Sequence, residues 1–212
     1  MVFFNKKNQR KIPCVGKHSK KVNTGSWNSE GLLITGAEDK ILTVSNSTGD
    51  TVLDSFIVKG KPHGLKWAKT QKSKDEENKD KEISAVMDSK FIIIIDINTT
   101  QNVEISFASG YGKLVDYEWF GDGYIATTFT NGIVSIISTH KEEIGREVQT
   151  LNVFNGAVEA MCINESLGKL GVAAHGAIKF YNINDWTECK SEQITINSDI
   201  GKITKLEWTK DG

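Results

Sequence analysis

The fold is decided by residues 116–137, which read DYEWFGDGYIATTFTNGIVSII. Asn131-Gly132 separates two runs that are rich in Ile, Thr and aromatic residues, and an Asn-Gly pair between such runs is a strong hairpin signal. Gly121-Asp122-Gly123 separates the first of these runs from an earlier one that ends at Trp119-Phe120, and a fourth run fits 146–153. Four short runs with turn residues between them predict one four-stranded antiparallel sheet.

The same plan recurs along the chain, with a marker residue near the end of the first strand of each unit. The marker is usually Trp, and the five positions are Trp27, Trp67, Trp119, Ile163 and Trp208. They are 40, 52, 44 and 45 residues apart, and the longest step contains a charged insertion at 70–82. A period of about 40–45 residues is typical of the four-stranded blades of a β-propeller. We therefore expect an all-β fold, a partial WD40-type β-propeller of about four blades plus incomplete end blades, although a β-sandwich also has many short strands.

The spacing also predicts where each blade lies. One domain is expected over 1–212, with blades at about 22–58, 62–107 (which contains the insertion 70–82), 113–153 and 157–196, and with incomplete ends at 1–21 and 202–212. The chain begins inside an outer strand and ends just after an inner-strand marker. We interpret it as an arc of a larger propeller whose end faces are built to be covered, because bare blade faces and edges promote aggregation.

Composition and charge exclude several classes of protein. The chain is 38% hydrophobic and 25% charged with only 2 Pro, which is typical of a globular protein and not of a disordered or collagen-like one. Its 26 Lys and Arg balance 27 Asp and Glu, so neither nucleic acid nor an anionic membrane is expected as the main partner, although a local basic patch could be hidden in this average. The longest apolar run, Phe91 to Ile95, is too short to cross a bilayer, and no signal peptide is visible. Three widely spaced cysteines favour a reducing compartment, so we expect a cytosolic or nuclear protein without direct membrane insertion.

No residue pattern points to catalysis, a cofactor or a metal. The four histidines lie in different predicted blades, without Cys or carboxylate ligands at metal-binding spacing: His18, His63, His140 and His175. No nucleophile elbow, phosphate-binding Gly loop or paired metal motif occurs. A propeller enzyme would instead need distant residues, such as Asp88, Asp116 and His175, to converge at the central channel.

The cysteines, the insertion and the Trp markers each have a structural interpretation. Cys162 alternates with its neighbours in a predicted strand and is expected to be a core thiol, while Cys14 and Cys189 have no activating base nearby in the sequence. The insertion 70–82 is too charged to order itself, so we expect a solvated loop, with a docking loop as the alternative. The Trp markers are expected to pack at blade faces, with an aromatic ligand cage as the alternative.

Five segments carry a resemblance to a known family. They are Arg10–Lys21, Gly36–Asn46, Tyr117–Gly123, Ile137–His140 and Leu206–Gly212. In this order they resemble the N-terminal propeller of the WD repeat-containing protein 19 family, also called intraflagellar transport protein 144. The similarity is specific before residue 60 and around Trp119, and it is weak over 70–104 and 184–200. The chain departs from the general WD pattern, because the Trp-Asp dipeptide is missing from every blade.

The resemblance implies a subunit of intraflagellar transport complex A, which supports retrograde transport in cilia and cilium assembly. It implies a non-enzymatic scaffold located in the cilium (axoneme and basal body) and the cytoplasm, with other complex A subunits and cargo adaptors as partners. It also places His18 in the Gly-His turn of a WD repeat, where the imidazole is expected to form hydrogen bonds within its blade. The alternatives are a WD-repeat scaffold of another assembly, such as a vesicle-coat subunit, and a propeller enzyme.

Overall fold

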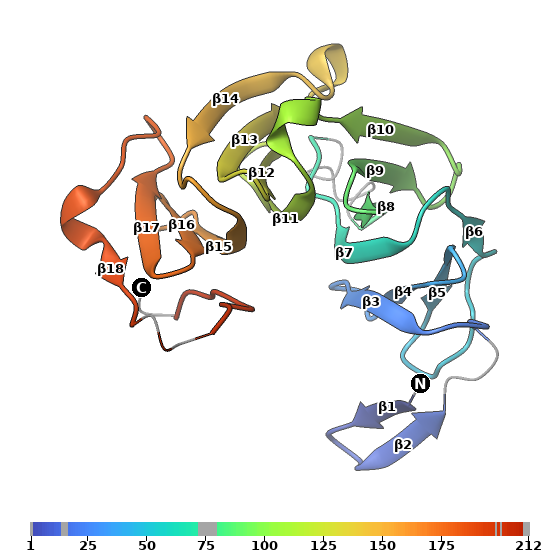
Figure 1. Cartoon of the computed structure of the whole chain (residues 1–212). Coiled ribbons are helices and arrows are strands. Elements are labelled where there is room, and N and C mark those ends of the chain that lie inside the picture. Colours follow the sequence, from blue (N-terminus) through green and yellow to red (C-terminus); the bar gives the residue numbers. More distant parts are fainter. Residues whose placement is uncertain (1, 14–16, 72–79, 198, 200, 210–212) are drawn as a thin grey trace. The chain divides into compact units, whose positions relative to one another are not determined.

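The structure of the protein, a computed structural model, describes residues 2–13, 17–71, 80–197, 199 and 201–209. Cys14 and most of the charged insertion 70–82 lie outside the described residues. In the described part, every regular element is a β-strand or a single turn of 3-10 helix (Figure 1). No helix there is long and apolar enough to span a bilayer. The predicted all-β class is therefore confirmed.

Among the described residues, four antiparallel sheets follow one another along the chain, and each contains four consecutive strands in chain order. A two-stranded antiparallel sheet of β1 (Val2–Asn5) and β2 (Arg10–Pro13) precedes them. Short turns can join only antiparallel neighbours, so a run of short strands and tight turns produces such meanders. The first sheet contains β3 (Val22–Trp27), β4 (Leu33–Ala37), β5 (Ile41–Ser45) and β6 (Phe56–Ile57), and the second contains β7 (Pro62–Trp67), β8 (Glu82–Met87), β9 (Phe91–Asp96) and β10 (Asn102–Ser106). The third contains β11 (Leu114–Phe120), β12 (Tyr124–Phe129), β13 (Ile133–Ser138) and β14 (Glu147–Asn152). The fourth contains β15 (Val158–Asn164), β16 (Lys169–Ala174), β17 (Ala177–Asn182) and β18 (Ile194–Thr195). The 3-10 turns are η2 (Ser109–Tyr111), η3 (Lys141–Glu143) and η4 (Lys190–Glu192).

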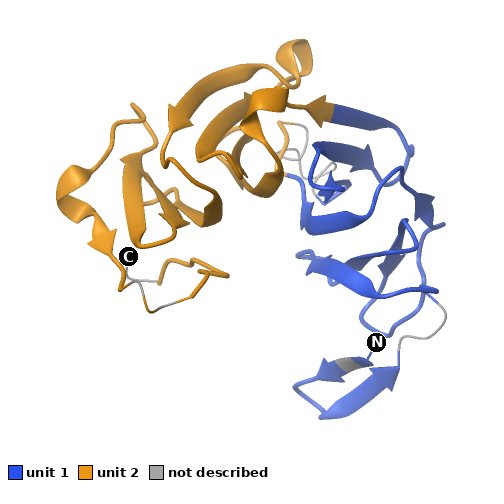
Figure 2. Cartoon of the chain, viewed as in Figure 1, with its two compact units in different colours: residues 1–68, 72–104 blue, residues 69–71, 105–212 orange. Residues whose placement is uncertain are grey.

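The chain forms two compact units, which Figure 2 shows in different colours. Unit 1 contains residues 1–68 and 72–104, and unit 2 contains residues 69–71 and 105–212. Unit 1 therefore holds the β1–β2 hairpin, the β3–β6 sheet and most of the β7–β10 sheet. Unit 2 holds the β11–β14 and β15–β18 sheets.

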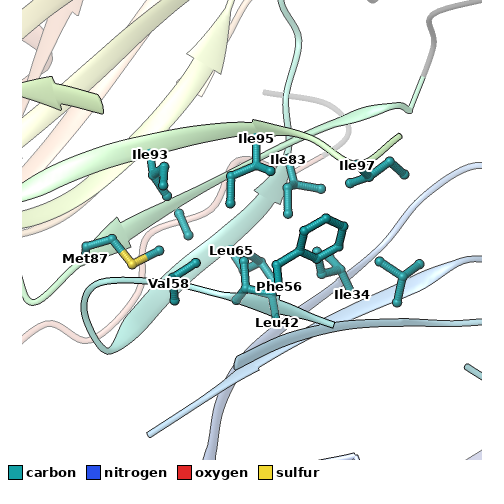
Figure 3. Packing of buried hydrophobic residues seen from close by; sticks show 12 residues of the cluster. Ile34, Leu42, Phe56, Val58, Leu65, Ile83, Met87, Ile93, Ile95 and Ile97 are labelled. Atoms are coloured by element: carbon teal, nitrogen blue, oxygen red, sulfur yellow. The ribbon is translucent and has the colours of Figure 1, made fainter. Parts of the chain in front are cut away.

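The core of unit 1 lies between its two four-stranded sheets. On β8 and β9 the side chains of alternate residues share one face, because successive residues of a strand point to opposite sides. On that face Ile83 and Met87 of β8 lie with Ile93 and Ile95 of β9, and they pack against residues of β4 and β5 that include Leu42 (Figure 3). All five side chains are at most 5% exposed. The opposite face of β9 is buried as well, as the unbroken run of isoleucines in this strand predicts.

Unit 2 contains the hairpin on which the fold prediction was based. β12 and β13 pair antiparallel from Tyr124↔Ser138 to Thr128↔Val134, and Gly132 in the turn has a φ of +77°. Gly adopts this left-handed conformation without the steric cost of a side chain. β15 of the last sheet packs against β11 and β12, in the same way that β7 packs against β3 and β4 in unit 1. Each unit thus contains two sequential sheets that bury a face against each other.

Two outer strands are much shorter than their sequence predicts. The runs 51–58 and 191–196, at the ends of the first and fourth predicted blades, each predict an outer strand along their length, but β6 and β18 have only two residues each. Residues 190–192 form the 3-10 turn η4 instead. An outermost strand pairs along one edge only, so water can satisfy its backbone groups and long pairing is not required.

Candidate functional site

A buried polar cluster ties the segment before β3 to the first four-stranded sheet. His18 Nε2 lies 2.9 Å from Thr35 Oγ1 on β4, and His18 Nδ1 lies 3.3 Å from Asp39 Oδ1 in the turn after β4. Thr35 Oγ1 in turn lies 2.9 Å from Thr43 Oγ1 on β5. The side chains of His18 and Asp39 are only 3% and 5% exposed, so the cluster stabilises the sheet and is not open to a ligand. His18 thus forms the predicted hydrogen bonds, and its partners lie in the β3–β6 sheet, although the predicted blade begins only at residue 22.

Asp39 is the centre of this cluster. Its carboxylate accepts a hydrogen bond of 2.8 Å from Ser19 N and one of 3.2 Å from Ile41 N. Burial acts to raise the pKa of Asp39, but these two backbone bonds and the contact with His18 outweigh it and hold the pKa below its usual value. The carboxylate therefore remains charged while it holds three parts of the chain together.

Side chains of the corresponding turns make a similar contact in the next two sheets. Asp88, after β8, accepts a 3.0 Å bond from Lys61 N, and Thr130, after β12, accepts a 2.9 Å bond from Lys113 N. In three sheets, therefore, the turn between the second and third strands binds the segment that leads into the first strand. Sequence reasoning missed this repeated contact, although an Asp or Thr within two residues of the end of the second strand, present in three of the four sheets, was a signal that could have found it.

The two Trp markers of unit 1 differ in environment. Trp27 ends β3 and its side chain is 49% exposed. Trp67 ends β7, is partly buried, and donates a 3.1 Å hydrogen bond from Nε1 to Ser26 O on β3. Trp67 thus connects the two sheets of the unit, while Trp27 contributes aromatic surface.

The markers of unit 2 also lie at strand ends or in packed segments. Trp119 is the second-last residue of β11 and is 5% exposed, and Ile163 holds the same place in β15 and is partly buried. Trp208 follows the last described strand, and its ring centroid lies 5.6 Å from that of Phe180 on β17. Residues 203–208 therefore cover part of the β15–β18 sheet, with Ile203 N donating a 2.8 Å bond to Glu159 Oε2.

A hollow of about 350 Å³ in unit 2 lies between β11, β15 and residues 204–208. Cys162 lines it, together with four carboxylates: Asp116, Glu118, Glu159 and Glu207. Burial raises the pKa of Cys162 to about 12, and the charges of Glu118 and Glu207 add to the rise. The thiol remains protonated at neutral pH and is only 9% exposed, so it is a core thiol, as predicted, and not a nucleophile.

A second, more open hollow of about 850 Å³ lies at the loop between β13 and β14, where Gln71 and residues 140–146 line it. The carboxylate of Glu143 contacts two basic side chains of this hollow: Glu143 Oε2 lies 2.8 Å from Arg146 Nη1, and Glu143 Oε1 lies 3.7 Å from His140 Nδ1. Hydrogen bonds from Ser138 and Arg146 hold the pKa of Glu143 below its usual value. Such a shallow charged surface is suited to polar contacts with another protein.

The residues that a propeller enzyme would need have separate surroundings. In unit 2, Asp116 lines the smaller hollow, whereas His175 is exposed in the turn between β16 and β17 and does not line that hollow. In unit 1, Asp88 is occupied by the turn contact with Lys61. Across the described residues, no group of three or more His, Cys, Asp or Glu side chains could hold a metal ion.

Comparison with known proteins places this chain in a family. The model of the WDR19 first beta-propeller matches all of residues 1–212. The chain belongs to this family. WD repeat-containing protein 19 of Mus musculus is 35% identical over the whole chain, and that of Homo sapiens is 31% identical. WD repeat-containing protein dyf-2 of Caenorhabditis elegans is 26% identical over 88% of the chain.

The family members are much longer than this chain, which spans 16% of the mouse and human proteins and 13% of dyf-2. Solved structures support the fold. The computationally designed Ika8 protein superposes with a TM-score of 0.67 and 17% identity, over 91% of this chain and 54% of its own. The β-propeller domain of Myceliophteria thermophila Cps50 (Swd1) superposes with a TM-score of 0.63 and 14% identity, over 85% of this chain and 59% of its own. The four-stranded sheets are those of a partial β-propeller, and the predicted fold class and family are both confirmed.

Proposed function

We propose that this chain is the propeller part of a non-enzymatic scaffold subunit of intraflagellar transport complex A. In this role it supports retrograde ciliary transport and cilium assembly by binding other subunits of the complex and cargo adaptors. The observation that carries the proposal is the match of residues 1–212 to the WDR19 first beta-propeller, together with relatives named WD repeat-containing protein 19 that are 35% and 31% identical. We place the protein at the axoneme and basal body of the cilium and in the cytoplasm.

We also propose that residues 22–58, 62–107, 113–153 and 157–196 are consecutive blades, and that 1–21 and 202–212 belong to incomplete blades. Trp27, Trp67, Trp119, Ile163 and Trp208 are then the corresponding markers of successive blades. Within each unit, the first strand of the second sheet packs against the first two strands of the sheet before it, which supports this assignment. Within each unit the two sheets pack against each other, and such a packed framework can position the loops at the strand ends for binding.

The chemistry of the two hollows agrees with binding rather than catalysis. One contains a buried thiol with a pKa of about 12, and the other contains an ion pair of Glu143 and Arg146. Neither offers an activated nucleophile with an adjacent base, which covalent catalysis requires. Protein–protein contacts do not require such a catalytic pair, because polar and charged side chains at the rim of an interface can bind a partner.

Affinity capture tests this proposal. Tagged full-length protein expressed in ciliated cells should recover other intraflagellar transport subunits, and imaging should place it at the basal body and axoneme. Gly132→Ala, which disturbs the β12–β13 turn, should reduce the recovery, whereas Gly31→Ala in an open turn should not. Recovery of chaperones alone would count against the proposal, and location at the Golgi or endosomes would favour a vesicle-coat scaffold.

A further inference from the structure

The sequence contains two Asn-Gly pairs, Asn131-Gly132 and Asn155-Gly156. The first forms the turn between β12 and β13, and the second lies in the connector between β14 and β15 (Figure 1). This connector joins the two sheets of unit 2, and the structure describes all four strands of both sheets. The two pairs therefore have the same local sequence but very different surroundings, which decide their chemistry.

An Asn that is followed by Gly can lose its side-chain amide without an enzyme. The backbone nitrogen of the Gly attacks Cγ of the Asn, and the new C–N bond closes a succinimide ring. The Cγ–Nδ2 bond breaks, and the proton of the attacking nitrogen leaves with the ammonia. Water then opens the ring at either carbonyl group, which leaves Asp or isoaspartate. The reaction needs an available backbone N–H and a chain that can rotate, and Gly provides the freedom of rotation.

Hydrogen bonds hold the pair in the β12–β13 turn. Gly132 N donates a 3.2 Å bond to Phe129 O, and Asn131 Nδ2 donates a 2.7 Å bond to Gly110 O. Asn131 N also donates a 3.3 Å bond to Tyr111 O. The attacking nitrogen and the leaving amide thus both have other partners, and they can react only after the turn opens locally.

The pair in the connector has no such restraint. Asn155, Gly156 and Ala157 are exposed, and within the described part of the chain no hydrogen bond involves Asn155 or Gly156. No atom lies within 4 Å of the position that a Cβ on Gly156 would take. Gly156 N is therefore available for the attack, and packing does not oppose the rotation that brings it to the Asn155 side chain.

The first half of the connector, in contrast, is anchored. Val153 N and Phe154 N both donate to Gly132 O, at 2.8 Å and 3.2 Å. Lys179 Nζ donates a 2.9 Å bond to Val153 O and lies 5.0 Å from the centre of the Phe154 ring. Rotation is thus confined to residues 155–157, so the reaction can proceed while the sheets on either side remain folded.

We propose that Asn155 is a site of spontaneous deamidation in the folded protein, with water as the reagent, and that Asn131 is protected. Both products carry one more negative charge than Asn, and isoaspartate also adds one carbon to the main chain. The charge and the length of the connector between the two sheets of unit 2 therefore change as the protein ages. The proposal goes beyond the scaffold function and does not depend on it.

Incubation of the full-length protein in water labelled with heavy oxygen tests the proposal. Water supplies the oxygen that replaces the amide nitrogen, so peptide mass spectrometry distinguishes deamidation during the incubation from deamidation during later handling. At mildly alkaline pH, the Asn155 peptide should incorporate the label at least about tenfold faster than the Asn131 peptide, because two hydrogen bonds must first break at Asn131-Gly132. In urea the two rates should become similar, because the two pairs share a sequence and the turn is lost.

Gly156→Ala should slow the reaction at Asn155 by about threefold or more, because Ala restricts the rotation of the backbone. Its Cβ enters open space, so the variant should fold normally. Gly110→Ala is the matched control, because its Cβ also meets no atom within 4 Å but the preceding residue is Ser109 and not Asn. This control should leave the rate at Asn155 unchanged.

Three outcomes would overturn the proposal: equal rates at Asn155 and Asn131 in the folded protein, reaction of Asn155 only in urea, or an equal effect of the two Ala variants on Asn155. Reaction only in urea would mean that the connector is held or covered in the full-length protein. Capture of transport subunits by the Gly156→Ala protein reports on the scaffold function separately.

Discussion

Leu65 N donates a 2.9 Å hydrogen bond to Thr24 Oγ1, which joins the first strands of the two neighbouring sheets in unit 1. Trp67 Nε1 adds a 3.1 Å bond to Ser26 O, two residues further along both strands. Adjacent sheets are therefore connected by directional bonds as well as by the apolar cluster between them. Leu65 is only 4% exposed, so water cannot easily replace Thr24 as the partner of its amide.

Thr24→Val should destabilise the protein, because it keeps the shape of the side chain and removes the acceptor. The buried amide of Leu65 then has no partner, and we expect the free energy of unfolding to fall by about 1–3 kcal/mol. Urea denaturation measures the change. Thr24→Ser keeps the hydroxyl oxygen, so its free energy of unfolding should fall less than that of Thr24→Val. If Thr24→Val were as stable as the wild type, the hydrogen bond would contribute nothing to stability.

The pH dependence of stability should include a contribution from Asp39. Its pKa in the folded protein lies below the ordinary value of 3.8, so the ionised carboxylate adds stability that is present above that value and is lost as the pH falls through the folded pKa. Between about pH 5 and pH 2, the free energy of unfolding of the wild type should therefore fall more steeply than that of Asp39→Asn. Denaturation midpoints measured across this range provide the comparison.

Asp185→Asn is the control for this measurement. Its carboxylate also has a lowered pKa, caused first by the hydrogen bond from the Thr187 side chain, but it lies in an exposed turn. Solvent screening makes such a group contribute little, so its removal should leave the profile nearly unchanged. Identical profiles for Asp39→Asn and wild type would contradict the role assigned to the buried cluster.

Gly132→Ala should be among the most damaging small substitutions in the chain. Gly132 has a φ of +77°, and a Cβ at this position would lie 1.7 Å from Phe154 O. Gly31 has a similar φ of +79°, but no atom lies within 4 Å of the position that its Cβ would take. Gly31→Ala therefore measures the cost of the backbone conformation alone, whereas Gly132→Ala adds the cost of the steric overlap. We expect Gly31→Ala to cost about 1–2 kcal/mol and Gly132→Ala clearly more, measured by thermal or urea unfolding. Equal effects of the two substitutions would show that the backbone of Phe154 can move aside.

Cys162 should resist alkylation in the folded protein. Its pKa of about 12 keeps it protonated at neutral pH, and it is buried, whereas Cys189 is partly exposed. Because the thiolate is the reactive form, iodoacetamide should modify Cys189 before Cys162, and it should reach Cys162 only when the protein unfolds. Mass spectrometry of peptides after timed labelling distinguishes the two sites. Rapid labelling of Cys162 without denaturant would show that unit 2 opens readily.

Local structure was predictable because it depends on residues that are close together in the sequence. The hairpin at β12–β13 follows from Asn131-Gly132 between two runs of β-forming residues, and the strands have nearly the predicted bounds. The buried state of both faces of β9 follows from its unbroken run of isoleucines. The all-β class and the sheet plan were accessible in the same way, whereas the family was indicated by the resemblance of five segments to known sequences.

The contacts that hold the sheets together were decided only by the tertiary structure. His18 and Asp39 are 21 residues apart, and Thr24 and Leu65 are 41 residues apart, so no local rule pairs them. Trp27 and Trp119 are predicted to be corresponding markers of the repeat, yet one is 49% exposed and the other 5%. The reason is physical: turn chemistry and alternation act within a few residues, whereas burial and long-range hydrogen bonds depend on which surfaces the packed sheets bring together.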